Sequence, residues 1–225
     1  MGHAVDGVLA EAAAVAVSPI AIVAIIVILA TSSGRLNGPL FTLGWLLGLA
    51  GLGAIMLAVG GPGGASAHHH PATWVGALKL ALGVLLVLFG CREWRRRPKD
   101  ASQAQLPSWM AAIDRFTPPK ILALGLALAA ANPKNAPLAI ASGASISSAG
   151  IPVSQQIAAL AIFVVIASLG VLAPLAIYLI MGERAKKMLG SWRDWAAQHN
   201  AAVMAVLFFV LGAKLIGDGI SILTS

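Results

Sequence analysis

The sequence predicts an all-α integral membrane protein with six transmembrane helices, and three observations support this prediction. Of the 225 residues, 59% are hydrophobic and only 10% are charged, whereas a soluble domain has about 25% charged residues. Six apolar segments are long enough to cross a bilayer, which takes about 20 residues. The basic residues fall in alternate connections between these segments, as in multi-pass membrane proteins. A soluble domain, a disordered chain and a disulfide-stabilised scaffold are therefore excluded.

The apolar segments divide the chain into two similar halves around a basic linker. They span residues 8–31, 36–59, 73–91, 119–142, 153–181 and 199–222. Glycine, proline and polar residues separate them, and residues 143–152 and 182–200 are expected to be loops. We predict a single membrane domain, residues 1–225, with a first three-helix repeat at 8–91, a linker at 92–118 and a second repeat at 119–222.

The distribution of lysine and arginine predicts the orientation in the membrane. The first, third and fifth loops contain Arg35, Arg92, Arg95, Arg96, Arg97, Lys99, Arg115, Arg184, Lys186, Lys187 and Arg193, with Lys120 at the edge of the third. The other loops and both tails contain none. Because basic loops stay in the cytoplasm, both termini are expected outside the plasma membrane. The charge then faces anionic lipid headgroups, and nucleic-acid binding is not expected.

Several loop and span-end features have structural interpretations. The linker stretch 108–116 is either an amphipathic helix in the headgroup layer or an ordered connection. The consecutive histidines 68–70 are not expected to hold a metal, because adjacent histidines do not converge on one ion. Gly44, Gly48 and Gly51 suit close helix packing. Interfacial anchors are expected at the ends of spans, at Trp45, Trp74, Trp94 and Trp192.

Three spans on each side of the linker mean that the two halves insert in opposite directions, as an inverted repeat. The third spans of the halves support this relation. Residues 82–90 and 211–219 share leucine, glycine, leucine and glycine at identical spacing.

The first span of each half contains a polar residue followed by proline. Proline lacks an N–H group, and it pushes the preceding residue away from helical geometry. Ser18-Pro19 should therefore free the Val15 carbonyl, and Asn132-Pro133 the Ala129 carbonyl. Pro137 should add a second break. Both breaks are expected near mid-membrane, where such backbone needs cover from protein or water, so the two breaks are predicted to face each other across a central cavity.

Lys134 lies beside the second break, near the middle of the membrane. Inserting a lysine at that depth costs about 2.5–3.5 kcal/mol. Its ammonium, with the N–H groups of the following half-helix, suits an anion. Two other interpretations remain: a structural lysine satisfied by carbonyls, and one that extends to the surface. The candidate substrate-binding residues are Ser18, Pro19, Asn132, Pro133, Lys134 and Asn135.

Four further charged residues are expected in the outer half of the membrane: Glu11, Lys79, Lys214 and Asp218. Lys214 and Asp218 are four residues apart and share a helix face. The four either line a vestibule or relay protons, or they form neutralising ion pairs. Pro174 has no polar neighbour and is expected to be a simple kink.

No enzymatic activity is expected. The sequence has no nucleophile elbow and no phosphate-binding loop for ATP. The single cysteine, Cys91, excludes a thiol–disulfide relay. Neither a metal nor a cofactor is predicted.

The sequence resembles the lysine-exporter (LysE) superfamily, and within it the Gap-like branch of glycolipid or peptidoglycolipid addressing proteins. The resemblance rests on Ser18-Pro19, on the Asn37, Phe41, Gly44-Trp45 and Gly48 run, and on 132–135, Asn-Pro-Lys-Asn. It covers nearly the whole chain. It implies a LysE-like fold of two inverted three-helix repeats, and a role in moving actinobacterial cell-envelope lipids or glycolipids across the plasma membrane.

The expected function is therefore export or flipping of a lipid or glycolipid with an anionic headgroup, by alternating access. Two alternatives are a small-solute exporter for amino acids or cations, and a non-transporting scaffold that assists a lipid-export machine. The expected partners are the membrane lipid substrate and anionic headgroups at the cytoplasmic face. Candidate protein partners are a second copy of the chain, as a homodimer, or lipid-export machinery.

Overall fold

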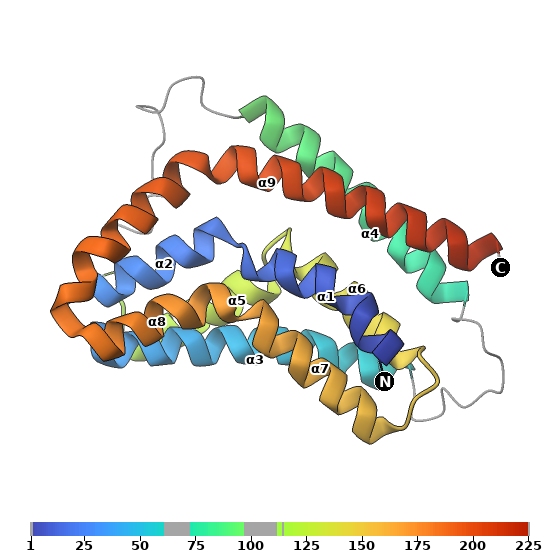
Figure 1. Cartoon of the computed structure of the whole chain (residues 1–225), viewed down its shortest axis with the longest axis horizontal. Coiled ribbons are helices and arrows are strands. Elements are labelled where there is room, and N and C mark those ends of the chain that lie inside the picture. Colours follow the sequence, from blue (N-terminus) through green and yellow to red (C-terminus); the bar gives the residue numbers. More distant parts are fainter. Residues whose placement is uncertain (1, 61–72, 97–111, 114, 225) are drawn as a thin grey trace.

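The computed structural model describes residues 2–60, 73–96, 112–113 and 115–224, and their regular structure is helical (Figure 1). The elements are α1 (Gly2–Ala16), α2 (Pro19–Ala30), α3 (Gly34–Gly60), α4 (Thr73–Arg96), α5 (Pro118–Ala130), α6 (Asn135–Ser147), α7 (Val153–Ala167), α8 (Leu169–Met181), the 3-10 helix η3 (Gly182–Arg184) and α9 (Ala185–Thr224). The histidines 68–70 and most of the stretch 108–116 lie outside the described residues.

The helices confirm a multi-pass membrane architecture. Within the described residues, α3, α4 and the Ala201–Thr224 part of α9 are each long and apolar enough to cross a membrane. Two bent pairs, α1–α2 with an angle of 43° and α7–α8 with an angle of 60°, raise the number of candidate spans to five. The remaining apolar segment, 119–142, consists of α5 and most of α6. A count of six spans stays a prediction.

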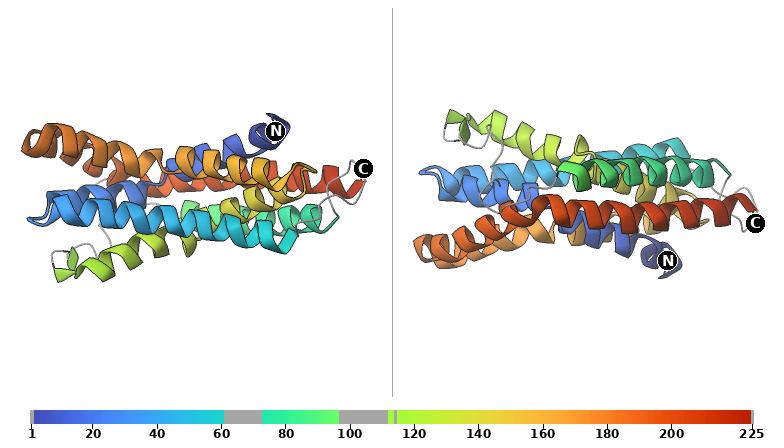
Figure 2. Two further views of the ribbon diagram at one scale, coloured as in Figure 1. Left: turned by 90° about the horizontal axis from the view of Figure 1, so that it is seen from below. Right: turned by 90° about the horizontal axis from the view of Figure 1, so that it is seen from above.

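The helices form an elongated bundle with both termini near one end (Figures 1 and 2). The starts of α3 and α5 and the junction of α8 with α9 lie at the opposite end. α4 packs along α9, and α3 packs along α5 and α6, while α1 contacts α6 and α7. The first half of the chain therefore contacts the second half throughout the bundle.

Glycine allows α3 and α5 to approach with their backbones in contact. A Cβ atom at Gly44 would collide with the Leu122 carbonyl of α5, and one at Gly125 would collide with the Phe41 carbonyl of α3. At Gly48, a Cβ atom would lie 2.8 Å from the Ala129 Cβ. The packing role expected for Gly44 and Gly48 is confirmed. The expectation for Gly51 is wrong, because no atom of the described part of the chain lies within 4 Å of its Cβ position.

The α4–α9 contact also depends on glycines. A Cβ atom at Gly83 would lie 2.8 Å from the Gly212 carbonyl oxygen, and one at Gly212 would lie 2.9 Å from the Gly83 carbonyl oxygen. These are the glycines that align between residues 82–90 and 211–219. Small residues permit this close approach, which adds dispersion contacts and suits helix packing in lipid.

The expectation of a loop over residues 182–200 is wrong. This segment forms η3 and the first turns of α9, which continues unbroken to Thr224. The segment reads as a loop because it is charged, yet its sequence is amphipathic. Ala185, Leu189 and Ala196 are buried, while Trp192 and Trp195 are exposed. This is the pattern of a helix at a membrane surface, where tryptophan and basic residues prefer to lie.

Two other expectations need correction. Trp45 is fully buried rather than an interfacial anchor, because it lies on the face of α3 that packs into the bundle. Trp74, Trp94 and Trp192 are exposed, as expected. The fifth span bends by 60° at Ser168, between α7 and α8, whereas Pro174 lies inside α8. Proline clashes with the backbone four residues earlier, which is Gly170, inside α8. The bend at Ser168 therefore lies outside the reach of Pro174.

Candidate functional site

The first break consists of Val17 and Ser18, between α1 and α2. Ser18 has φ −112° and ψ 94°, an extended conformation that a following proline favours. Its N–H group consequently donates to the Ala16 carbonyl at 3.0 Å and not to the Ala14 carbonyl, which a continuous helix would use. Carbonyl groups at the C-terminal end of α1, where the helix dipole is negative, are left for other donors.

In the second break, residues 131–134, hydrogen bonds from nearby asparagines satisfy part of the free backbone. Asn132 Oδ1 accepts the Lys134 N–H at 2.9 Å, and the Asn132 carbonyl accepts the Ala136 N–H at 3.0 Å. Asn135 Nδ2 donates to the Leu128 carbonyl at 3.0 Å. Pro137 lies in the first turn of α6, where the missing N–H removes no helical hydrogen bond. The prediction of a second break there is wrong.

Lys134 connects the two breaks. Its side chain is fully buried, and Nζ donates to the carbonyls of Ala14 at 2.5 Å and Val17 at 2.9 Å. The sequence expected a free carbonyl at Val15; the ammonium instead binds carbonyls on either side of it. A cation at the C-terminal end of α1 also interacts favourably with the helix dipole. The geometry is that of a lysine satisfied by carbonyls, and the side chain does not extend to the surface.

Three buried polar atoms in and beside the breaks have no hydrogen-bond partner within the described part of the chain. They are Ser18 Oγ, Asn135 Oδ1 and Ser142 Oγ. Asn135 and Ser142 are seven residues apart on α6 and therefore share a face. An unsatisfied buried polar atom costs about 1–3 kcal/mol, so a functional role is a reasonable explanation for keeping several of them.

The four outer charged residues form one network across α1, α4 and α9. Lys214 Nζ lies 2.8 Å from Glu11 Oε1 and 3.0 Å from Asp218 Oδ2. Lys79 Nζ lies 3.4 Å from the same Asp218 oxygen. Two cations balance two anions, which is the arrangement expected of neutralising ion pairs. Glu11 Oε2 is nevertheless buried, and none of the residues that the structure describes gives it a hydrogen bond.

We expect Lys214→Met to destabilise the protein more than the double variant Lys214→Met with Glu11→Gln. The single change leaves Glu11, 2% exposed, as a charge without a partner, and breaking such a pair costs about 3 kcal/mol. The double variant removes the orphaned charge as well. Thermal denaturation in detergent measures the difference. A double variant that melts below the single variant would contradict the assignment of Glu11 as the partner of Lys214.

The sequence analysis missed Ser168 and Gly170, which shape the region around the first break. Ser168 Oγ donates to the Val164 carbonyl at 2.6 Å at the bend between α7 and α8. A Cβ atom at Gly170 would collide with the Ala16 carbonyl, so α8 contacts the end of α1 directly. The sequence pattern that could have indicated this bend and close approach is a serine two residues before a glycine, upstream of Pro174.

Comparison with known proteins identifies the family. The family described as Sap, sulfolipid-1-addressing protein, matches residues 8–221. No curated protein and no solved structure matches the chain. The match confirms the resemblance to glycolipid-addressing proteins; the LysE superfamily and its Gap-like branch stay predictions. The match extends across both breaks and both glycine-packed helix pairs, and the chain therefore belongs to the Sap, sulfolipid-1-addressing protein family.

Proposed function

We propose that this protein moves an anionic cell-envelope lipid or glycolipid across the plasma membrane by alternating access. Membership of a sulfolipid-addressing family supports the substrate class, because a sulfolipid carries an acidic headgroup. The observation that carries the mechanism is the pair of hydrogen bonds from Lys134 Nζ to α1. These bonds link the two broken helices through a buried cation, and we propose that an anionic headgroup competes for that cation.

In the proposed cycle, Lys134 changes partners. In the conformation seen here, its ammonium is fully buried and donates to Ala14 and Val17. When α1 moves, the ammonium becomes available to a sulfate or phosphate oxygen, to which charge-assisted hydrogen bonds are strong. Ser18 Oγ and Asn135 Oδ1, which have no hydrogen-bond partner in the described part of the bundle, are then available to sugar hydroxyl groups. The acyl chains stay in the bilayer.

The proposal includes six spans in two inverted repeats, with both termini outside. Gly83 packs against Gly212, the residue with which it aligns, and antiparallel helices related by a two-fold axis bring equivalent residues together in this way. The two termini lie near one end of the bundle, and the starts of α3 and α5, beside Arg35 and Lys120, lie at the other (Figure 2). That arrangement supports a cytoplasmic position for the basic end.

The proposal is tested with purified protein in phosphatidylcholine vesicles. A fluorescent sulfated glycolipid reports lipid movement when an impermeant quencher bleaches the outer leaflet, and labelled lysine reports small-solute transport. We expect lipid exchange to be faster than in empty vesicles by at least about tenfold, or about 1.4 kcal/mol in barrier. Transport of lysine without transport of lipid would contradict the proposal and indicate a small-solute exporter. Movement of neither would replace it with a scaffold that assists a larger machine.

We expect Ser18→Ala to slow lipid exchange without lowering stability. The hydroxyl is buried and has no partner among the described residues, so its removal deletes none of their hydrogen bonds and can relieve a desolvation cost of about 1–3 kcal/mol. Ser145→Ala is a matched control, because Ser145 Oγ already donates to the Ala141 carbonyl at 2.8 Å. Exchange at the wild-type rate by Ser18→Ala would exclude this hydroxyl from substrate contact.

A further inference from the structure

Two lysines from different helices hold the same carboxylate oxygen in the half of the bundle nearer both termini. Lys79 Nζ of α4 lies 3.4 Å from Asp218 Oδ2, and Lys214 Nζ of α9 lies 3.0 Å from it. α4 and α9 pack side by side (Figure 1). Charge-assisted hydrogen bonds from ammonium groups also hold sulfate and phosphate oxygens. The Asp218 carboxylate therefore occupies a position that suits the oxyanion of an acidic headgroup.

Backbone contacts fix the distance between the two helices that carry these lysines. Lys79 lies between Gly76 and Gly83 of α4, and a glycine of α9 approaches each of them. A Cβ atom at Gly219 would lie 2.8 Å from the Gly76 carbonyl oxygen, and one at Gly212 would lie 2.9 Å from the Gly83 carbonyl oxygen. The helices are thus in contact on both sides of Lys79. A ligand would meet ammonium groups already in place, which lowers the cost of ordering the site on binding.

The two partners in the Lys79–Asp218 pair differ in their access to solvent. The Lys79 side chain is 8% exposed, whereas the Asp218 side chain is 34% exposed. Within the described ranges of the chain, Asp218 is the one residue that forms an ion pair with Lys79. A buried cation that loses its partner is costly. When the Asp218 carboxylate turns toward solvent, binding of another anion between the two lysines is therefore favoured.

The charge of the remaining cluster suits a monoanion. Lys214 Nζ also lies 2.8 Å from Glu11 Oε1, and the Glu11 side chain is 2% exposed, so this pair is buried more deeply than Asp218. Two lysines and one glutamate carry one net positive charge once Asp218 has left. A sulfate ester carries one negative charge. It can replace the Asp218 carboxylate and leave the cluster neutral, as buried charges require.

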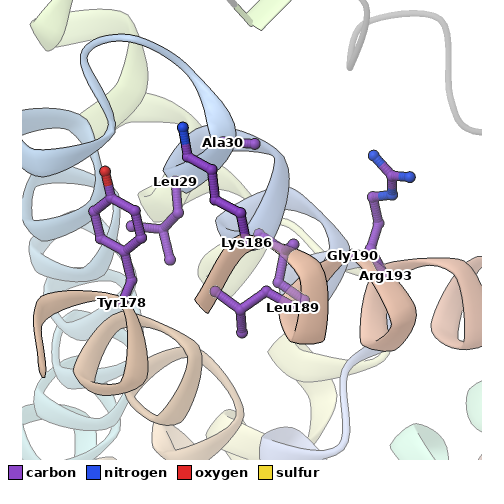
Figure 3. Close-up of a pocket in the computed structure, with 8 residues that line it drawn as sticks. Leu29, Ala30, Tyr178, Lys186, Leu189, Gly190 and Arg193 are labelled. Atoms are coloured by element: carbon purple, nitrogen blue, oxygen red, sulfur yellow. The ribbon is translucent and has the colours of Figure 1, made fainter. Parts of the chain in front are cut away.

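The cations at the basic end of the bundle do not converge in this way. A cavity of about 60 Å³ lies there between α2, α8 and α9, and its lining includes Lys186 and Arg193. Figure 3 shows the Arg193 guanidinium well apart from the end of Lys186. Arg193 Nη2 instead lies 2.7 Å from Asp194 Oδ1, and these two side chains are 38% and 57% exposed. The Arg193–Asp194 pair therefore serves as the control for loss of a carboxylate from an exposed ion pair.

We infer that Lys79 and Lys214 form a second binding site for the sulfate or phosphate group of an anionic lipid, and that the Asp218 carboxylate competes with the headgroup for this site. This inference rests on the proposed function, in which such a lipid is the substrate. The site lies on the side of the membrane proposed to be outside. It would receive the headgroup after the buried Lys134, and return of Asp218 to the two lysines would release the lipid.

The site is tested by isothermal titration calorimetry of the full chain in phosphatidylcholine nanodiscs. The ligands are a short-chain sulfated galactolipid, its unsulfated counterpart, inorganic sulfate and inorganic phosphate. We expect Asp218→Asn to bind the sulfated lipid at least about fivefold more tightly than the wild-type protein, because the competing carboxylate is gone. Lys79→Gln should weaken binding at least about tenfold. In the matched control, Asp194→Asn, the affinity should stay within about twofold of the wild-type value.

Thermal denaturation separates a binding site from a purely structural ion pair. Without ligand, Asp218→Asn should melt below the wild-type protein, because Lys79 loses its partner. The sulfated lipid should raise the melting temperature of Asp218→Asn more than that of the wild-type protein, since it returns an anion to the two lysines. Lys79→Gln leaves Asp218 paired with Lys214, so this variant tests the site even if Asp218→Asn does not give folded protein.

Each outcome decides the inference. Tighter binding of the sulfated lipid alone by Asp218→Asn supports a lipid headgroup as the ligand, and an equal gain with inorganic sulfate or phosphate supports a free oxyanion at the same site. Unchanged or weaker binding by Asp218→Asn, an equal gain in Asp194→Asn, unchanged affinity in Lys79→Gln, or equal binding of the unsulfated lipid would overturn the site.

The same measurements distinguish this site from the proposed function. Binding needs no transport, so a protein that shows these affinity changes but does not flip lipid would overturn the proposed function alone. A protein that flips lipid while the variants bind like the wild-type protein would overturn this site alone.

Discussion

Lys134→Met is expected to abolish lipid exchange and to lower the stability of the protein. The side chain is fully buried and supplies hydrogen bonds to Ala14 and Val17. Methionine has a similar length and no donor, so both buried carbonyls lose their partner at about 1–3 kcal/mol each. We expect exchange to fall at least about 100-fold, or about 2.7 kcal/mol in barrier. The vesicle assay measures the rate, and thermal denaturation measures the stability.

Lys134→Arg separates the structural from the functional role of this residue. Arginine keeps the charge and supplies donors for both carbonyls, so the Lys134→Arg protein should be more stable than the Lys134→Met protein. Its rigid planar guanidinium presents the charge to a headgroup in a different geometry from an ammonium. Lys187→Met is the control for loss of a lysine at an exposed position. If Lys134→Met protein exchanged lipid at the normal rate, Lys134 would have no place in the transport site.

Gly44→Ala is expected to prevent normal packing of α3 against α5. The added methyl group would collide with the Leu122 carbonyl, which is backbone and cannot rotate away. Overpacking costs about 1–3 kcal/mol and occasionally more, and we expect the upper end here because a whole helix must shift. The measured effect is loss of monodisperse protein in detergent and a lower melting temperature.

Gly51→Ala provides a matched control on the same helix. Its Cβ position has no described atom within 4 Å, and alanine is favoured over glycine in a helix by about 1 kcal/mol. We therefore expect unchanged or slightly higher stability. Equal stability of Gly44→Ala and Gly51→Ala would show that α3 and α5 do not approach as closely as the structure indicates.

Local chemistry made the breaks predictable. Proline removes an N–H group wherever it occurs, and the ends of α1 and α5 fall where Pro19 and Pro133 indicate. The partner of Lys134 was not predictable, because it depends on which helix packs beside α6. An anion, a set of carbonyls and the surface all satisfy a lysine, and 120 residues separate Lys134 from Ala14.

The wrong predictions share one cause: they were made from the position of a residue along the chain and not from its surroundings in the fold. Trp45 lies near a span end, yet the face of α3 on which it lies decides its burial. Charges over residues 182–200 indicated a loop, whereas a charged helix is stable at a membrane surface. The bend at Ser168 was assigned to Pro174 because proline marks distortion without fixing its exact residue.

The ion pair between Glu11 and Lys214 has a consequence for biosynthesis. The ribosome adds Lys214 203 residues after Glu11, which takes about 10–40 s at about 5–20 residues per second. During that interval α1 is in the translocation machinery or the bilayer without its counter-ion. The Glu11 carboxylate therefore lacks its partner within the membrane, where an unpaired charge is costly, until the last helix packs beside the first.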